Sequence, residues 1–201
     1  MATAAGPKRK RRAYAARVPA EQRRAQLLDA ALHLVVTQGH NGATMDAVAE
    51  QAGVTKPVIY SQFRRRDELL AELLRREHDA ALRQLLAILP DQVAPAPEFL
   101  AGLLADFLRV VQDAPDRWYC IVMPMADMPP QFHAARESAR ALVLQQAEEI
   151  TRRLPDTPLD TEIVAHTAVT LFEMAARLVL TDPEHFRPER FVTALQAAIS
   201  S

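Results

Sequence analysis

Residues 44–63 read TMDAVAEQAGVTKPVIYSQF, and this stretch predicts two short helices joined by a tight turn. Thr44 is suited to cap the first helix, in which apolar residues recur about every 3.6 positions. Gly53 ends that helix, and only two residues separate it from the next one. Pro57 lies in the first turn of the second helix, where no backbone N–H is needed, and Thr55 is suited to cap it. Helix, turn and helix in this order predict a helix-turn-helix.

The second of these helices has one apolar and one polar face. Ile59 and Phe63 lie four residues apart, so they share the face that packs on the first helix. Residues 55–57 and 60–62 then face outward and carry mainly Thr, Lys, Tyr, Ser and Gln side chains. Such a surface is rich in hydrogen-bond donors and can contact phosphates and base edges.

The whole chain of 201 residues fits an all-α fold. Glycine is scarce, Ala and Leu dominate, and strict apolar alternation is absent. Including the helix-turn-helix, we expect about nine helices, with prolines at most of the boundaries. Outside residues 44–63, the expected helices cover residues 19–38, 67–89, 98–113, 115–123, 129–153, 160–181 and 188–200.

Positive charge is concentrated in the first part of the chain. Residues 1–76 hold 14 Lys and Arg against 7 Asp and Glu, whereas residues 77–201 hold 10 against 18. The first part could therefore attract a polyanion. Residues 1–17 include five consecutive cations and predict a basic arm that follows DNA phosphates or enters the minor groove. The alternative is a solvated tail.

Other classes of protein find little support in the sequence. Cys120 is the single cysteine, and we expect it to be buried and structural rather than nucleophilic. The six histidines are scattered and no glycine-rich phosphate loop is present, so we expect no catalytic residue, metal or cofactor. No apolar run approaches a membrane span and no signal peptide is visible, so the cytoplasm is the expected location.

Residues 44–69 resemble the DNA-binding signature of the TetR/AcrR family of bacterial transcription regulators. The matching features are Thr44, Val48–Ala49, the turn at residues 52–54, Tyr60, Phe63 and the DEL sequence at residues 67–69. Residues 20–75 fit the family's three-helix plan, and the rest fits in length, helical pattern and helix order. Val58 departs from the small or hydroxyl residue that the family often carries there, and Arg65 departs from the Ser or Asn that often caps the following helix.

The resemblance implies a homodimer whose two recognition helices enter successive major grooves of a DNA operator, about 34–36 Å apart. Thr55, Lys56 and Pro57 are the candidates for contact with base edges. The other candidates for contact with DNA are Thr44, Tyr60, Ser61, Gln62, Arg65 and Arg66.

The resemblance also implies a division of the chain. We expect a basic arm at residues 1–17, a helix-turn-helix domain at 18–66, a linking helix and loop at 67–97, and a C-terminal domain at 98–201 for ligand binding and dimerisation. Residues 162–180 are apolar nearly all round, which favours burial of the final two helices against a second copy, with an intramolecular core as the alternative.

Met and aromatic residues gather at residues 118–132 and indicate an adaptable apolar pocket, with plain core as the alternative. The candidate ligand-binding residues are Phe107, Trp118, Tyr119, Met123, Met128, Phe132, Phe172 and Arg177. A mostly apolar small molecule would then release a repressor from its operator. There are two alternatives: a transcriptional activator, and an architectural DNA-binding protein with a ligand-blind C-terminal domain.

Overall fold

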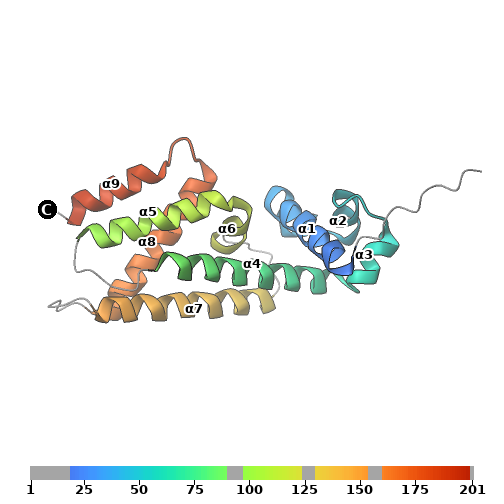
Figure 1. Cartoon of the computed structure of the whole chain (residues 1–201), viewed down its shortest axis with the longest axis horizontal. Coiled ribbons are helices and arrows are strands. Elements are labelled where there is room, and N and C mark those ends of the chain that lie inside the picture. The colour runs from blue at the N-terminus through green and yellow to red at the C-terminus, as the bar shows by residue number, and fades with distance from the viewer. Residues whose placement is uncertain (1–18, 90–96, 124–129, 154–159, 200–201) are drawn as a thin grey trace, which may run out of the picture.

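The computed structural model describes residues 19–89, 97–123, 130–153 and 160–199, and these residues form nine helices and no strand. The all-α prediction is therefore confirmed. Figure 1 shows an elongated molecule with α1–α3 at one end, which we call the head, and α5–α9 at the other, which we call the body. Helix α4 runs from the head into the body. The helices are α1 Ala20–Gly42, α2 Met45–Gln51, α3 Lys56–Gln62, α4 Arg66–Ile88, α5 Pro97–Asp113, α6 Pro115–Val122, α7 Pro130–Arg152, α8 Thr161–Thr181 and α9 Pro188–Ile199.

The turns of the head follow the sequence pattern closely. Helix α1 is kinked at Gly39, and α2 ends before Gly53; both glycines have a positive φ, of 75° and 63°, that other residues rarely adopt. The Thr44 hydroxyl caps α2 by accepting a hydrogen bond from the Ala47 N–H at 3.2 Å. Thr55 occupies the cap position of α3, but its hydroxyl makes no capping hydrogen bond. The prediction that Thr55 is the N-cap residue is therefore confirmed, but without the side-chain hydrogen bond that usually accompanies it.

The core of the head forms around the two apolar residues that α3 turns inward. Ile59 and Phe63 are completely buried. They lie in one apolar cluster with residues of α1, α2 and α4, including Leu27, Ala31, Val48 and Leu69. Because α3 has seven residues and could not persist as an isolated helix, this packing stabilises its helical conformation.

Arg24 of α1 holds α3 and α4 together. Its Nε donates to Oε1 of Glu72 at 2.6 Å, and its Nη1 donates to the carbonyl oxygen of Gln62 at 2.5 Å. The guanidinium also lies over the Phe63 ring, with its Cζ 4.1 Å from the ring centroid. One side chain thus forms an ion pair, satisfies a carbonyl at the end of α3, and covers the aromatic anchor.

A second side chain of α1 performs a similar task for α2. The Nε2 of Gln26 donates to the carbonyl oxygen of Ala52 at 2.6 Å. Helix α1 therefore supplies hydrogen-bond donors to the last turns of both α2 and α3, where helical carbonyls have no partner within their own helix. This arrangement sets the orientation of both helices relative to α1.

The short helix α6 contributes to two separate apolar clusters. Cys120 is buried in the head cluster, whereas Trp118 and Val122 are buried in a body cluster with residues of α5 and α8. The expectation that Cys120 is buried is confirmed. Burial raises the pKa of its thiol to about 12, so the thiol stays protonated at neutral pH. Along α4, the head cluster ends at Leu74 and the body cluster begins at Ala81.

The ion pair of Arg24 and Glu72 gives the stability of the head a defined dependence on pH. The hydrogen bond from Arg24 lowers the pKa of Glu72 below its ordinary value. A carboxyl group with a lowered pKa stabilises the fold above its unfolded-state pKa of about 4.3, and this contribution is lost as the pH falls through the lower folded value. We expect Glu72→Gln to reduce the free energy of unfolding by about 1 kcal/mol at pH 7, and by less near pH 3.

Urea unfolding followed by circular dichroism at both pH values measures this difference. Glu50→Gln is a matched control, because Glu50 is exposed on α2 and makes the same change of charge. Equal stability of the two variants at pH 7 would contradict the role given to Glu72.

Candidate nucleic-acid interface

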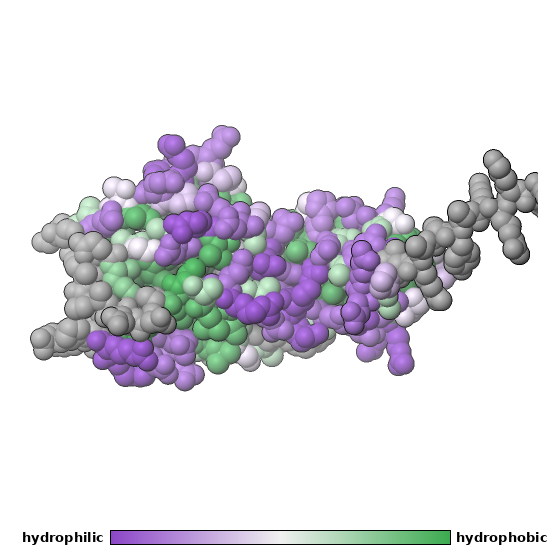
Figure 2. All heavy atoms as spheres, viewed as in Figure 1, coloured by the Kyte–Doolittle hydropathy of each residue, from purple (hydrophilic) through white to green (hydrophobic). Residues whose placement is uncertain are grey.

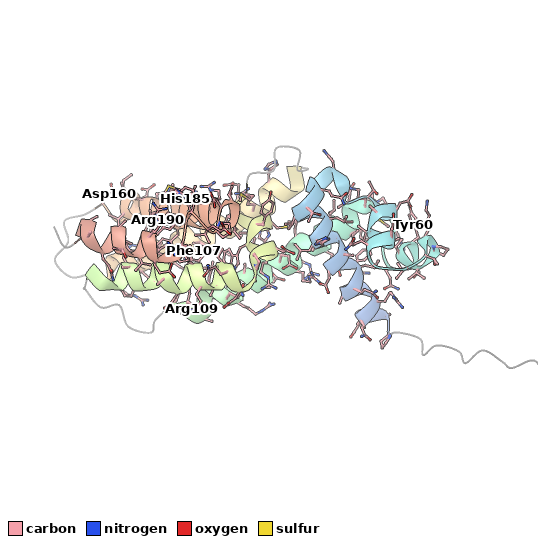
Figure 3. The ribbon with its side chains drawn as sticks, turned by 90° about the horizontal axis from the view of Figure 1, so that it is seen from above. Tyr60, Phe107, Arg109, Asp160, His185 and Arg190 are labelled. Atoms are coloured by element: carbon pink, nitrogen blue, oxygen red, sulfur yellow. The ribbon has the colours of Figure 1, made fainter. Side chains whose placement is uncertain are left out.

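One surface of the head carries the outward side chains of α3 and the start of α2. Tyr60 is 51% exposed, and Figure 3 shows it on the head, far from Phe107 in the body. The side chains around it are exposed, except for Gln62, which is half-buried. We call this surface the reading face; it consists of Thr44, Thr55, Lys56, Pro57, Tyr60, Ser61 and Gln62.

Lys56 of the reading face is paired with an aspartate of α2. Its Nζ lies 2.7 Å from Oδ2 of Asp46, and both side chains are exposed. The hydrogen bond and the charge of Asp46 raise the pKa of Lys56, so the amine remains protonated. Exposed pairs of this kind contribute little to stability, so Lys56 can exchange Asp46 for another acceptor. The residues lie ten apart in sequence, and sequence analysis did not find this pair.

Two polar side chains at the end of α3 are directed partly back onto the head. The Ser61 hydroxyl donates to the carbonyl oxygen of Val58 at 2.7 Å, and the Gln62 amide donates to Ser61 Oγ at 3.3 Å. The hydroxyl proton of Ser61 is therefore used locally. Tyr60, by contrast, extends from the surface with its ring and hydroxyl exposed.

The three consecutive arginines at residues 64–66 differ in their contacts. Arg66 Nε donates to the carbonyl oxygen of Ala43 at 3.0 Å, and its Nη2 donates to the carbonyl oxygen of His40. These carbonyls follow the kink of α1 and need partners, so Arg66 joins α1 to α4. Its guanidinium is thus engaged within the head, and the contact of Arg66 with DNA stays a prediction.

Arg64 and Arg65 are exposed and form no ion pair with other described residues. Arg65 occupies the cap position of α4 without a side-chain cap, and the Glu68 carboxylate accepts from the Arg64 N–H at 2.9 Å. Both guanidiniums are therefore available to an anion. Arg64 was not in the sequence-based set, although it lies in the same basic run.

The candidate ligand-binding residues form part of a packed core. The Phe107 ring lies 5.1 Å from Trp118 in an edge-to-face arrangement and 5.5 Å from Phe172, measured between ring centroids. Tyr119, Met123 and Arg177 are half-buried. The three rings of Phe107, Trp118 and Phe172 pack on one another between α5, α6 and α8, and binding of a ligand at these residues stays a prediction. Met128 lies outside the described residues, as does the side chain of Phe132.

A buried carboxylate stands where α1, α4 and α6 meet. Glu77 is 1% exposed, and its two oxygens accept from Arg76 Nε at 2.7 Å and from Arg117 Nε at 2.9 Å. Arg76 also reaches Asp29 of α1 at 2.8 Å, and Arg117 reaches Gln84 at 3.2 Å. This cluster borders a groove between α1, α4 and α6 and connects the head to the body. Its sequence signal is the placement of a glutamate on the apolar stripe of α4.

Helix α8 leaves apolar side chains uncovered. Ile163 is 61% exposed and Met174 is 41% exposed, and Thr167 and Thr170 complete an exposed stripe between them. In the view of Figure 2, apolar residues are visible on the body, whereas the visible surface of the head is mainly hydrophilic. Among the described helices, α8 alone has the length and hydropathy of a membrane span, but it packs against α5, α6, α7 and α9.

Comparison with known sequences identifies relatives of the head. Residues 27–73 match the family described as bacterial regulatory proteins, tetR family. The chain is 41% identical over 78 residues to the transcriptional activator FasR of Mycolicibacterium smegmatis, and this match covers 37% of this chain and 36% of FasR. It is 42% identical over 64 residues to the regulator SrpR of Pseudomonas putida, covering 31% of this chain and 30% of SrpR. The matches thus span about a third of each relative.

Solved structures share the arrangement of both head and body. A TetR-like regulator from Rhodococcus sp. RHA1 superposes with a TM-score of 0.74 at 24% identity, over 91% of this chain and 96% of that one. AibR, solved with isovaleryl coenzyme A and operator DNA, superposes with a TM-score of 0.71 at 16% identity, over 88% of this chain and 97% of AibR. Bacillus subtilis FadR, solved with stearoyl-CoA, superposes with a TM-score of 0.67 at 14% identity, over 88% of this chain and 97% of FadR. At these identities the likeness shows the fold.

The pair of Lys56 and Asp46 leads to a prediction about affinity for DNA. Asp46→Asn removes a carboxylate beside the reading face and frees Lys56 for a phosphate or a base. We expect DNA binding in about 100 mM salt to tighten roughly three- to tenfold, the range of a modest charge interaction. Fluorescence anisotropy with a labelled duplex measures it. Glu50→Gln makes the same change of charge on α2, so an equal gain from both variants would show that release of Lys56 is not the cause.

Proposed function

Because the chain belongs to the TetR family of bacterial regulatory proteins, we propose that it is a cytoplasmic repressor that binds a palindromic operator as a homodimer and leaves it when an apolar effector binds. The main support for DNA binding is that α3 exposes Lys56 and Tyr60 while Ile59 and Phe63 are completely buried beneath them. We assign DNA binding to residues 18–66, linkage to residues 67–97, and effector binding and dimerisation to residues 98–201.

In this proposal the first turn of α3 enters the major groove. Thr55, Lys56 and Pro57 contact base edges, and Lys56 exchanges Asp46 for a guanine acceptor. The phosphates are contacted by Thr44, Tyr60, Ser61, Gln62, Arg64 and Arg65, because these side chains border the same exposed surface. Residues 1–17 lie outside the described residues, and their cluster of cations adds attraction to the DNA backbone.

Dimerisation is supported by the uncovered stripe on α8. Ile163 and Met174 expose large apolar side chains that no described residue of the same chain covers, and such surfaces mark interaction sites. Helix α9 adds exposed alanines, including Ala194 and Ala198, that allow close approach of another helix. Self-association of α8 and α9 would hold two heads at one fixed separation, which binding to two half-sites requires.

Release by an effector is supported by the position of α6. This helix places Trp118 in the body cluster and Cys120 in the head cluster, and its Arg117 holds Glu77 of α4. An effector that rearranges the body core would therefore shift contacts with the head and favour a dimer whose heads no longer match the grooves. AibR and FadR, which share this fold, were solved with acyl-CoA molecules, so acyl thioesters are the first effectors to test.

The test of this function is selection of bound duplexes from random DNA, followed by release of the selected duplex with acyl-CoA molecules. A palindromic motif is expected. Binding without sequence preference, with a steep salt dependence, would instead identify an architectural DNA-binding protein.

Two substitutions on the selected duplex separate the roles within the reading face. Lys56→Ala should relax the preference at one base pair per half-site, with a loss of about 1–3 kcal/mol against the preferred base. Tyr60→Ala should weaken binding to all sequences alike, because a phosphate contact carries no base information. Binding isotherms with the motif and its single-base variants measure both effects. A uniform loss from Lys56→Ala would make Lys56 a phosphate contact.

A charge on the α8 stripe tests the proposed dimer. Ile163→Glu should produce monomers and lower operator affinity by about 100-fold, because the two heads then bind independently. Light scattering after size exclusion and the binding isotherm are the measurements. Leu86→Glu is the control, since Leu86 is another exposed large apolar residue and lies on α4. A dimer of Ile163→Glu that remains stable at micromolar concentration would remove α8 from the interface.

A further inference from the structure

The buried indole of Trp118 has a hydrogen-bond donor with no partner in the part of the chain that the structure describes. Trp118 is 2% exposed, and its Nε1 forms no hydrogen bond with any described residue. The side chain lies in the aromatic cluster with Phe107 and Phe172. Buried donors in folded proteins are nearly always paired, so an unpaired indole N–H in the centre of a domain is a feature to be explained.

Three arginines of the neighbouring helices are bound to other residues. On α6 itself, Arg117 is bound to Glu77 and Gln84. On α7, Arg136 donates to the carbonyl oxygens of Val122 and Met123, while Arg140 pairs with Glu173 of α8. Trp118 itself belongs to an apolar cluster with side chains from α5, α6 and α8, including Leu108, Val122 and Ala176.

We propose that the Trp118 Nε1–H donates to a carbonyl oxygen of the effector, and that the effector is an apolar chain carrying an uncharged carbonyl group, such as an acyl thioester. This inference rests on the proposed function as an effector-released regulator. The carbonyl is uncharged because burial among Phe107, Phe172 and Val122 would deprive a carboxylate of its water, a cost that a neutral carbonyl group largely avoids. A pure hydrocarbon would leave the indole N–H unpaired.

Entry of the acyl chain requires the aromatic cluster to open. Phe172 is half-buried and packs on Phe107, which in turn packs edge-to-face on the indole. Displacement of Phe172 would therefore expose the inner rings in order, and the acyl chain would replace the lost ring contacts. Since Cys120 lies two residues after Trp118 on α6, a shift of the indole is also a shift of a side chain in the head core.

The chain contains one tryptophan, so its indole N–H gives a single resonance in the ¹⁵N–¹H spectrum of the full-length protein. The probes are octanoyl-CoA and S-octyl-CoA, a thioether that differs by lacking the carbonyl oxygen, together with 2-decanone as a carbonyl compound without CoA. We expect octanoyl-CoA and 2-decanone to move the indole resonance downfield. Calorimetry should show that octanoyl-CoA binds about tenfold more tightly than S-octyl-CoA, the ratio expected for one hydrogen bond.

Trp118→Phe keeps an aromatic ring but removes the donor, and it should reduce this ratio to about one. Phe186→Leu, an aromatic substitution outside the cluster, should preserve the ratio. The inference is overturned by equal affinities for the two CoA compounds, by a ratio that survives Trp118→Phe, or by an indole resonance that neither carbonyl probe moves. Release of the selected duplex by both CoA compounds alike would refute the role of Trp118 while leaving the proposed function standing. The wild-type resonance decides the matter even if the variant does not fold.

Discussion

The guanidinium of Arg24 is the interaction on which the geometry of the head depends. It is bound to Glu72 of α4, to the last turn of α3 through the Gln62 carbonyl, and to the face of the Phe63 ring. A helix of seven residues has little stability of its own, so its direction is set by what holds its ends and its buried face. Arg24 acts on both, which makes the exposed face of α3 a rigid surface rather than a flexible segment.

Side chains that contact several helices at once also connect the head to the body. Helix α4 is continuous through both parts, but continuity alone would allow the head to bend or twist about it. The Glu77 cluster joins α1, α4 and α6 at one point, and Cys120 extends the body's α6 into the head core. A buried carboxylate with two guanidinium partners is strongly directional, because loss of either partner leaves a charge without compensation. The junction can therefore transmit a displacement of α6.

Much of the fold could be read from the sequence because its signals are local. Prolines and glycines at the ends of apolar stripes predicted every described helix to within a few residues, and Thr44 caps α2 as expected. The sequence did not supply the side-chain partners. Arg66 of α4 donates to the carbonyl oxygen of Ala43, and Phe107, Trp118 and Phe172 pack on one another across three helices. In each case the partner is a residue distant in sequence.

The sequence by itself determined the helices, their order and the polar outward face of α3, because periodicity, capping and turn chemistry act over a few neighbouring residues. Only the tertiary structure decided which charged groups are engaged within the chain and which remain exposed, since the partners of Arg24, Lys56, Arg66 and Glu77 include residues many positions away. Spacing along a chain states which residues share a helix face. It does not state which other helix that face will meet, and that meeting left the Trp118 indole buried without an acceptor among the described residues.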